Sequence, residues 1–252
     1  MRTRVGLAWV TEVRISVDIN NPDGERIPFD YQYSLASAMY SKLKLIDEKL
    51  ARDLHESKGF RHFCFSNLLL GDHESDRQGL RFSKAKLIIS SPSEEFIRDF
   101  AEGFLLEPQL RIDSAILQVA KVEILPKNEF DSVMRLRTLS PIITRTIREN
   151  EGEKIEWELY PRDGKFYDNI HSNLMERYMD FHGVAPDNDC FEITQVHWFK
   201  PKRVSVAGTP RRCSLMEFTM TASEELMDFA FHSGLGEKQA MGFGCVGLVE
   251  NS

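Results

Sequence analysis

The chain has few of the features that place a protein in a membrane, in an oxidising compartment or at a metal centre. Its 252 residues contain no apolar run that approaches ~18 residues, so no segment is expected to span a bilayer. The N-terminal residues lack a long apolar stretch followed by a small-residue cleavage site, which predicts a cytoplasmic protein. The four cysteines are widely spaced without a Cys-x-x-Cys pair, so free thiols are expected rather than a zinc site or disulfides.

Net positive charge is also missing. Asp and Glu outnumber Lys and Arg by 39 to 32, and binding to a phosphate backbone needs clustered basic side chains. Three windows, 77–90, 134–148 and 200–212, nevertheless contain Lys and Arg but no acid. Such segregation can create a basic groove on an acidic protein, although ordinary solvated strand faces would give the same pattern.

Apolar periodicity predicts the same order of elements twice. In the first half, alternating residues predict strands and a spacing of three to four predicts helices. The expected strands are 4–19, 63–69, 80–89 and 109–125, and the expected helices are 31–44, 46–59 and 93–106. Asp30 and Ser93 are expected to cap the first and the last of these helices.

The second half repeats this order after a linker at Pro126–Glu129. Its expected strands are 134–147, 190–206, 213–221 and 241–249, and its expected helices are 166–182 and one that starts at Ser223. Two copies of a β-α-β-β-α-β unit predict an α+β protein with two tandem ferredoxin-like domains. We expect these domains to cover residues 1–126 and 127–252.

The most distinctive segment is a glycine run near the C-terminus, where Gly234 and Gly236 form one Gly-x-Gly pair and Gly242 and Gly244 form another. Glycine accepts positive φ and allows a close backbone approach, so such a loop can expose amides that hold phosphate. Because no Gly-Lys-Ser/Thr follows, the run is not a Walker A loop. The alternative interpretation is a helix C-cap followed by a bulged strand.

This run, with Met241-Gly242-Phe243-Gly244-Cys245-Val246 at its end, resembles the C-terminal signature of the CRISPR repeat-cleaving endoribonucleases, the Cas-six family of the RAMP superfamily. Other segments resemble that family in the same order along nearly the whole chain: Asp53–Gly59, Gly103–Pro108, Thr138–Ile142 and Lys200–Arg203. The resemblance implies cleavage of precursor RNA without a metal or other cofactor. In that reaction the 2′-hydroxyl attacks the adjacent phosphorus, leaving a 2′,3′-cyclic phosphate and a 5′-hydroxyl.

The reaction needs a base, an acid and a cation. The resemblance implies that His55 and Tyr40 fill the two proton roles, leaving open which is the base and which the acid, and that Arg61 supplies the cation. The pKa of histidine, about 6.5, suits either proton role. Tyr40 lies fifteen residues before His55, as the family's tyrosine often does, and Tyr33 is a rival on nearly the same helix face. Arg61 stands where some members have lysine, and arginine can clamp phosphate but does not give up its proton. Lys58 and His62 could take over the missing role.

The expected partner is CRISPR repeat RNA within the precursor transcript. The candidate RNA contacts are the basic residues of the windows and the glycine run, namely Lys58, Arg137, Arg145, Lys200, Lys202, Arg203, Gly234, Gly236, Lys238, Gly242 and Gly244. A homodimer and association with other subunits of an effector complex both stay open. The main alternative function is a RAMP-type subunit that holds RNA without cutting it.

Overall fold

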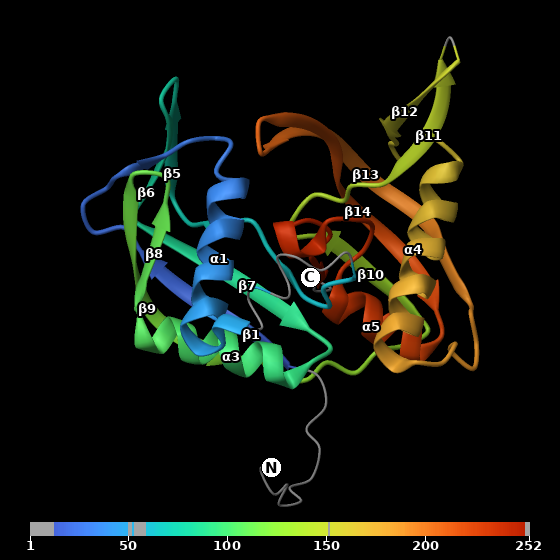
Figure 1. Ribbon diagram of the computed structural model, residues 1–252, viewed down its shortest axis with the longest axis horizontal. Helices are drawn as coiled ribbons and strands as arrows, with labels where there is room; N and C mark the ends of the chain where they lie inside the picture. Colours follow the sequence, from blue (N-terminus) through green and yellow to red (C-terminus); the bar gives the residue numbers. More distant parts are fainter. Residues whose placement is uncertain (1–12, 50–51, 53–58, 151, 250–252) are drawn as a thin grey trace, which may run out of the picture.

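The computed structural model describes residues 13–49, 52, 59–150 and 152–249. Two antiparallel sheets, one from each half of the chain, lie side by side and carry the helices (Figure 1). We call residues 13–124 the N-terminal half and residues 133–248 the C-terminal half. No described helix is both long and apolar enough to cross a membrane.

The sheet of the N-terminal half has the order β3 (Cys64–Phe65), β7 (Lys84–Ser91), β1 (Val13–Asn20), β9 (Ala115–Ile124) and β8 (Gln109–Ile112). A short strand, β4 (Leu69–Leu70), also pairs with β7. Helices α1 (Gln32–Ile46) and α3 (Glu94–Leu106) contact each other and this sheet. Alternation in β1 buries Ile15, Val17 and Ile19, so the sheet and helices enclose one apolar core.

Three short strands form a separate sheet at the side of this half: β2 (Arg26–Ile27), β6 (Gly79–Phe82) and β5 (His73–Asp76). The hairpin of β5 and β6 projects from the body of the molecule in Figure 1.

The sheet of the C-terminal half has the order β13 (Phe191–Val206), β14 (Thr209–Ala222), β10 (Val133–Thr138) and β15 (Val246–Leu248). Helices α4 (Lys165–His182) and α5 (Glu224–Ser233) cover it around a second apolar core. A further hairpin of β11 (Arg145–Asn150) and β12 (Glu153–Glu158) stands apart from the sheet, and a short 3₁₀ turn, η1 (Gln239–Met241), precedes β15.

Both halves have the same strand order. In each, the strand after the first helix pairs with the third strand, the third with the first, and the first with the last. This is the order of the split βαβ unit, so the prediction of two tandem ferredoxin-like folds is confirmed. The expected boundary between residues 126 and 127 stays a prediction.

Two of the three predicted helix N-caps are observed, and one is not. Ser93 and Ser223 accept hydrogen bonds from the amides of Phe96 (3.5 Å) and Leu226 (3.4 Å), as Ser N-caps do. The expected cap at Asp30 is wrong, because α1 begins after Tyr31 without a side-chain cap. Asp30 instead accepts a hydrogen bond from the amide of Ser205 at 2.9 Å and so ties the two halves together.

The predicted strand over 134–147 is wrong as one element, because it is divided into β10 and β11. Between them the chain leaves the sheet through Pro141, which has no N–H for a ladder. The amide of Leu139 there donates to the carbonyl of Cys245 at 2.7 Å. This divided strand therefore brings residues 139–145 against the glycine run.

A buried arginine joins the two halves. The guanidinium of Arg14 in β1 donates to the carbonyls of Val246 (2.8 Å) and Phe231 (2.5 Å) and lies 3.7 Å from the Phe231 ring centroid. Burial lowers the pKa of Arg14, and a buried charge is tolerated only when it is hydrogen-bonded in this way. The interface fixes the C-terminal segment against the N-terminal sheet.

Candidate active site

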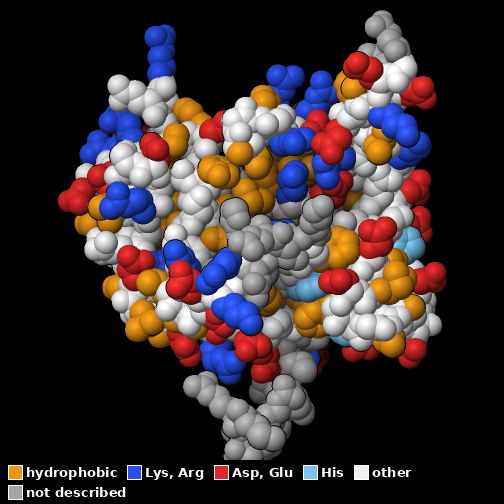
Figure 2. All heavy atoms as spheres, in the orientation of Figure 1, with side chains coloured by type: hydrophobic (Ala, Val, Ile, Leu, Met, Phe, Trp, Pro, Cys, Tyr) orange, Lys and Arg blue, Asp and Glu red, His pale blue; other side chains and the backbone are white. Residues whose placement is uncertain are grey.

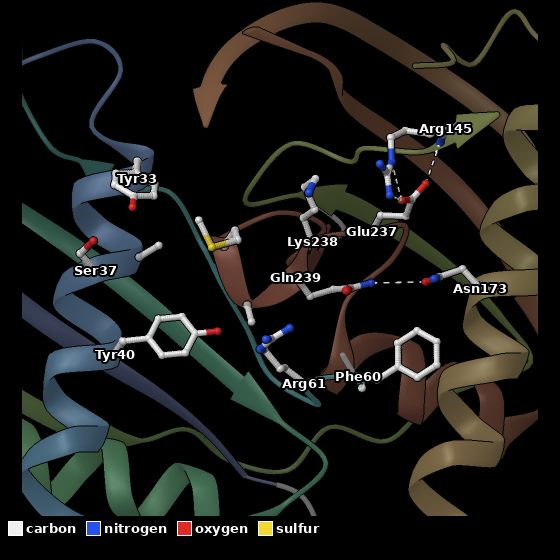
Figure 3. Close-up of a pocket in the computed structure, with 14 residues that line it drawn as sticks. Tyr33, Ser37, Tyr40, Phe60, Arg61, Arg145, Asn173, Glu237, Lys238 and Gln239 are labelled. Carbon is white, nitrogen blue, oxygen red and sulfur yellow. Dashed lines mark hydrogen bonds and ion pairs between the residues drawn. The ribbon is translucent and has the colours of Figure 1, made fainter. Parts of the chain in front are cut away.

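A cavity of about 570 Å³ lies between the two halves (Figure 3). The N-terminal half contributes α1 and residues 59–61 to its lining. The C-terminal half contributes Arg145, Asn173 and residues 237–241 of the glycine run. His55 and Lys58 lie outside the described residues, which resume at Gly59 on the cavity wall.

Tyr40 occupies the α1 wall of this cavity. Figure 3 shows its side chain pointing from the helix toward Arg61. Burial raises the pKa of Tyr40, and the positive charge of Arg61 partly opposes this shift. The phenol therefore keeps its proton at neutral pH and is a hydrogen-bond donor rather than a base.

Tyr33 lines the same cavity two turns earlier on α1, so the structure leaves both tyrosines in contact with the site. Its side chain is 47% exposed, whereas that of Tyr40 is half-buried and packs edge-on against Phe63 at 6.0 Å between ring centroids. Tyr40 is thus the better-fixed of the two hydroxyl groups.

Arg61 lies on an extended segment that leads into β3. Its side chain lines the cavity, and its neighbours Gly59 and Phe60 line it as well (Figure 3). The amide of Phe63 donates to the carbonyl of Arg61 at 2.9 Å, and the buried Phe63 ring packs against Phe96 and Phe100 in the N-terminal core. The sequence predicted Arg61 and Tyr40 as partners in one site, and the structure brings them to one cavity.

His62 points elsewhere. Its Nε2 lies 2.8 Å from a carboxylate oxygen of Asp180, and its ring packs on Phe181 with 5.0 Å between centroids. Burial lowers the pKa of His62, while Asp180 opposes the shift. His62 therefore belongs to the contact between the halves, and the structure does not bring it to the cavity as a substitute proton donor.

The glycine run folds into the seam between the halves. Gly234, Gly236, Gly242 and Gly244 all have positive φ, between 73° and 82°. A Cβ on Gly242 would overlap the side chains of Gln32 and Phe65, and one on Gly244 would overlap the carbonyl of Leu235. Close approach of other chain segments, which the sequence indicated, is the reason these positions need glycine.

More amides of this run donate hydrogen bonds within the protein than we expected. The amides of Gly234, Gly242 and Gly244 donate to the carbonyls of Ala230, Gln239 and Pro141 at 2.8–2.9 Å. The expectation of exposed amides is therefore wrong for these three glycines. RNA contact by the four glycines stays a prediction, and the surface that the run offers to the cavity is residues 237–241.

Arg145 is engaged in ion pairs rather than directed to solvent. Its Nε donates to Glu237 at 2.7 Å and its Nη1 to Glu156 at 2.6 Å. Burial alone would lower the pKa of Arg145, but these two carboxylates outweigh burial and raise it. Lys238, the next residue to Glu237, lines the cavity beside this network.

The remaining basic candidates lie on the sheet of the C-terminal half. Arg137 is exposed on β10, and Lys200 and Arg203 are exposed on β13. Alternation along β13 puts Lys200 and Lys202 on the face that carries buried Val204, and Arg203 on the opposite face. In Figure 2, Lys and Arg side chains mixed with acidic ones gather along the rim between the two halves.

Sequence reasoning missed several residues that shape the site. Gln32 donates through Nε2 to the carbonyl of Gly242, and Phe60 lines the cavity beside Arg61. Arg177, fully buried in α4, donates to Ser233 Oγ (2.7 Å) and to the carbonyl of Gly234 (2.6 Å). Phe60 could have been noticed as an aromatic between Gly59 and Arg61, whereas nothing local marks Gln32 or Arg177.

A seam between two ferredoxin-like units, with a glycine loop and a cavity that holds Tyr40 and Arg61, defines a RAMP-type protein. Comparison with known proteins gives the family. The N-terminal model of CRISPR-associated protein Cas6 matches residues 26–123, and the C-terminal model of CRISPR-associated protein Cas6 matches residues 125–248. The chain therefore belongs to the Cas6 family, and the resemblance in the sequence analysis is confirmed.

Individual relatives cover nearly the full length. The "CRISPR-associated endoribonuclease Cas6 1" of Methanocaldococcus jannaschii is 35% identical over 95% of this chain and 94% of its own. An endoribonuclease-like Cas6 protein of Pyrococcus furiosus is 33% identical over 90% of this chain and 95% of its own. A solved structure described as "An RAMP protein binding different RNA substrates" has 31% identity and a TM-score of 0.86, covering 94% of this chain and all of that one.

Proposed function

We propose that this chain, an endoribonuclease of the Cas6 family, binds CRISPR repeat RNA and cleaves precursor crRNA at the cavity between its halves. The observation that carries the proposal is the placement of Tyr40 and Arg61 on one cavity wall, with His55 between them in the sequence. A cavity with a phenol and a guanidinium supplies a hydrogen-bond donor and a clamp for a scissile phosphate.

In the proposed reaction, His55 takes the proton from the 2′-hydroxyl, which attacks the neighbouring phosphorus. Arg61 stabilises the added negative charge on the non-bridging oxygens, and Tyr40 donates a hydrogen bond to the same group. The bond to the 5′-oxygen then breaks, this oxygen takes a proton from water, and His55 releases its own proton to water. The products are a 2′,3′-cyclic phosphate and a 5′-hydroxyl. Proton transfer and these protein groups supply the chemistry, so the proposal requires no divalent metal ion.

We expect RNA to approach along the rim of basic side chains that leads to the cavity. Lys200, Lys202, Arg203 and Arg137 would contact its phosphates, and Lys58 would act close to the scissile bond. A homodimer, further effector subunits and a cytoplasmic location are also expectations. Size-exclusion chromatography of the purified chain with and without RNA tests the first.

A second candidate function is RNA holding without cleavage. Two observations favour it: Arg61 stands where a proton-donating lysine occurs in some members, and a relative at 33% identity is described only as endoribonuclease-like. In this case the cavity would bind the backbone of the repeat, and the RNA would remain whole.

End-labelled repeat RNA in excess EDTA separates these functions. We expect cleavage to a product with a 2′,3′-cyclic phosphate, identified by mass spectrometry and by its resistance to 3′-end ligation. Binding without cleavage in either EDTA or Mg²⁺ would support the holding function. Turnover that strictly needs Mg²⁺ would contradict the proposed mechanism.

A further inference from the structure

The hairpin of β11 and β12, which projects from the C-terminal half, has two faces that differ in charge (Figure 1). Because side chains alternate along a strand, the register puts Arg145, Glu156 and Glu158 on one face. Arg148 and Trp157 lie on the other face. The strand β12 also contacts β14, so residues of β14 can reach the side chains of both faces.

The arginines on the first face are neutralised by carboxylates. Arg145 donates to Glu237 at 2.7 Å and to Glu156 at 2.6 Å. Arg211, from the start of β14, donates to Glu156 at 3.3 Å and to Glu158 at 3.1 Å. Arg145 and Glu237 also line the cavity between the halves (Figure 3). The positive charge of this face is therefore compensated within the protein.

On the second face, two arginines lie over one indole ring. The guanidinium carbon of Arg148 is 4.6 Å from the centroid of the Trp157 ring, and that of Arg212 is 4.4 Å from it. Arg211 and Arg212 thus reach opposite faces of the hairpin, as neighbours along a strand do. Because the face of a Trp ring attracts cations, the half-buried indole holds two guanidinium groups close together.

The charges of Arg148 and Arg212 are not compensated by the side chains that the structure describes. No described carboxylate lies within ion-pair distance of either guanidinium, and this includes Glu153, which shares their face nearer the tip of the hairpin. Two like charges near one ring repel each other, and each guanidinium has N–H donors along its edge. An anion that accepts hydrogen bonds from both would offset the repulsion.

The position of these two arginines relative to the cavity favours an RNA phosphate as the anion. The strand β11 begins at Arg145 on the cavity wall, and Arg148 is three residues further along it. At the rise of an extended strand this distance is about 10 Å, the length of about three nucleotides of a nucleic-acid strand. An RNA with its scissile phosphate in the cavity therefore carries further phosphates within reach of the hairpin.

We propose that Arg148, Trp157 and Arg212 form a second RNA contact, which binds backbone phosphates a few nucleotides away from the scissile bond. This inference rests on the proposed function, from which it takes the substrate. Trp157 fixes the two guanidinium groups, and their N–H donors bind the phosphate oxygens. The contact holds the strand and takes no part in breaking a bond, so it contributes to affinity and leaves the chemical step unchanged.

The test measures binding and cleavage separately. Binding is followed by fluorescence anisotropy over a range of salt concentrations, with repeat RNA that has a 2′-deoxy nucleotide at the scissile position and so stays whole. Cleavage is measured with natural repeat RNA in single-turnover reactions at saturating protein.

Three double variants are compared with the unchanged protein. In the first, Arg148→Ala and Arg212→Ala remove both guanidinium groups. In the second, Arg148→Lys and Arg212→Lys keep the charges but lose the planar forks. The control combines Arg98→Ala and Arg111→Ala, which removes the same number of exposed arginines from the N-terminal half. Melting temperatures show whether each variant is folded.

We expect the double alanine variant to bind RNA at least about tenfold more weakly at physiological salt, with a salt slope smaller by about one unit per arginine. Its cleavage rate at saturating protein should stay within about twofold of that of the unchanged protein. The double lysine variant should keep the salt slope but lose about threefold or more in affinity, because lysine binds phosphate as a point charge. The control should match the unchanged protein in both affinity and slope.

Two results would overturn this inference alone. A double alanine variant that matches the control in affinity and slope would show that the stacked arginines only stabilise the hairpin. Full affinity of the double lysine variant would show that the planar groups on Trp157 are not what binds the strand. Failure of the unchanged protein to bind repeat RNA would overturn the proposed function and this inference together.

Discussion

The two walls of the cavity are built in different ways. On the N-terminal wall, Tyr40 belongs to a regular helix, α1, and Arg61 precedes Phe63, which is buried in the first apolar core. On the C-terminal wall, Lys238 belongs to an irregular loop that is held by glycines with positive φ and by the ion pairs of Arg145. A periodic element and a tightly packed loop thus present charged and polar groups to the same space.

The comparison shows that two halves with the same strand order can contribute different structural elements to one site. In the N-terminal half the last strand, β9, has ten residues and follows α3 through β8. In the C-terminal half the equivalent strand, β15, has three residues, and the glycine run replaces its beginning. Shortening this strand creates the loop that closes the cavity.

The largest expected effect comes from the N-terminal wall. His55→Ala should slow cleavage by ~10²- to 10⁴-fold, because that is the usual contribution of a group that transfers a proton in the transition state. Affinity for repeat RNA should barely change, since one imidazole adds little to a surface with many phosphate contacts. Single-turnover rates and filter binding measure the two quantities. Full activity of the variant across the pH range would remove His55 from the mechanism.

A somewhat smaller loss is expected at Arg61. Arg61→Ala should lower the cleavage rate by about 10²- to 10³-fold, the effect of removing one group that stabilises developing charge. Tyr40→Phe should cost less, because water can replace a phenolic hydroxyl. Arg98→Ala is a matched control on an exposed position of α3. An Arg61→Ala variant as active as this control would show that the clamp lies elsewhere on the N-terminal wall.

Substitutions in the glycine run of the C-terminal wall should lower the stability of the fold and leave the cleavage rate of the bound complex largely unchanged. Gly242→Ala forces a side chain into positive φ (81°) and against Gln32 and Phe65, which should lower the free energy of unfolding by about 2 kcal/mol or more. Gly164→Ala is the matched control, because a Cβ there meets nothing within 4 Å and its φ is −52°. Urea unfolding compares the two. Equal stability of both variants would contradict the packing role of the glycine run.

The rim of basic side chains should affect the salt dependence of binding. Replacing Lys200 and Lys202 together by Ala should reduce the slope of log affinity against log salt by about one unit per lost phosphate contact. Lys200 and Lys202 lie on the face of β13 that carries Val204, and Arg203 lies on the opposite face. We therefore expect a smaller change in the slope from Arg203→Ala. A slope that responds only to Arg203 would place the RNA on the other side of the hairpin.

The smallest expected effect is the pH dependence of stability that comes from His62, which contacts Asp180 between the two halves. Because burial lowers the pKa of His62 in the folded protein, the unfolded chain binds a proton more readily. The stability that neutral His62 contributes is therefore present above about pH 6.5 and is lost as pH falls through its lower folded pKa.

Melting temperatures at pH 7.5 and pH 5.5 test this effect. The fall between the two should be smaller in His62→Gln than in the unchanged protein. His182, whose pKa burial also lowers, remains in both proteins and accounts for the residual change. An identical fall would show that His62 is not a source of acid sensitivity.

Much of the fold followed from local patterns. Alternating apolar residues predicted β1 and β13, and helical spacing with Ser caps predicted α3 and α5 close to their observed ends. The cap at Asp30 failed because its hydrogen-bond partner, Ser205, lies far along the chain. The continuous strand over 134–147 failed although Pro141, inside the segment, is a local signal against a strand interior. Tyr40 and Arg61 could be proposed from spacing and resemblance, whereas their shared cavity could not be derived from either.

The sequence by itself determined the periodicity of the elements and their duplicated order, since each depends on residues close together along the chain. Only the tertiary structure decided that Arg145 would bind Glu237, that His62 would turn to Asp180, and that Tyr40 and Lys238 would line one cavity. The pair of Arg145 and Glu237 depends on packing within the C-terminal half, and the other two outcomes depend on how the two sheets meet. The buried Arg14 and the close-packed glycines fix that meeting through contacts between residues more than 200 positions apart.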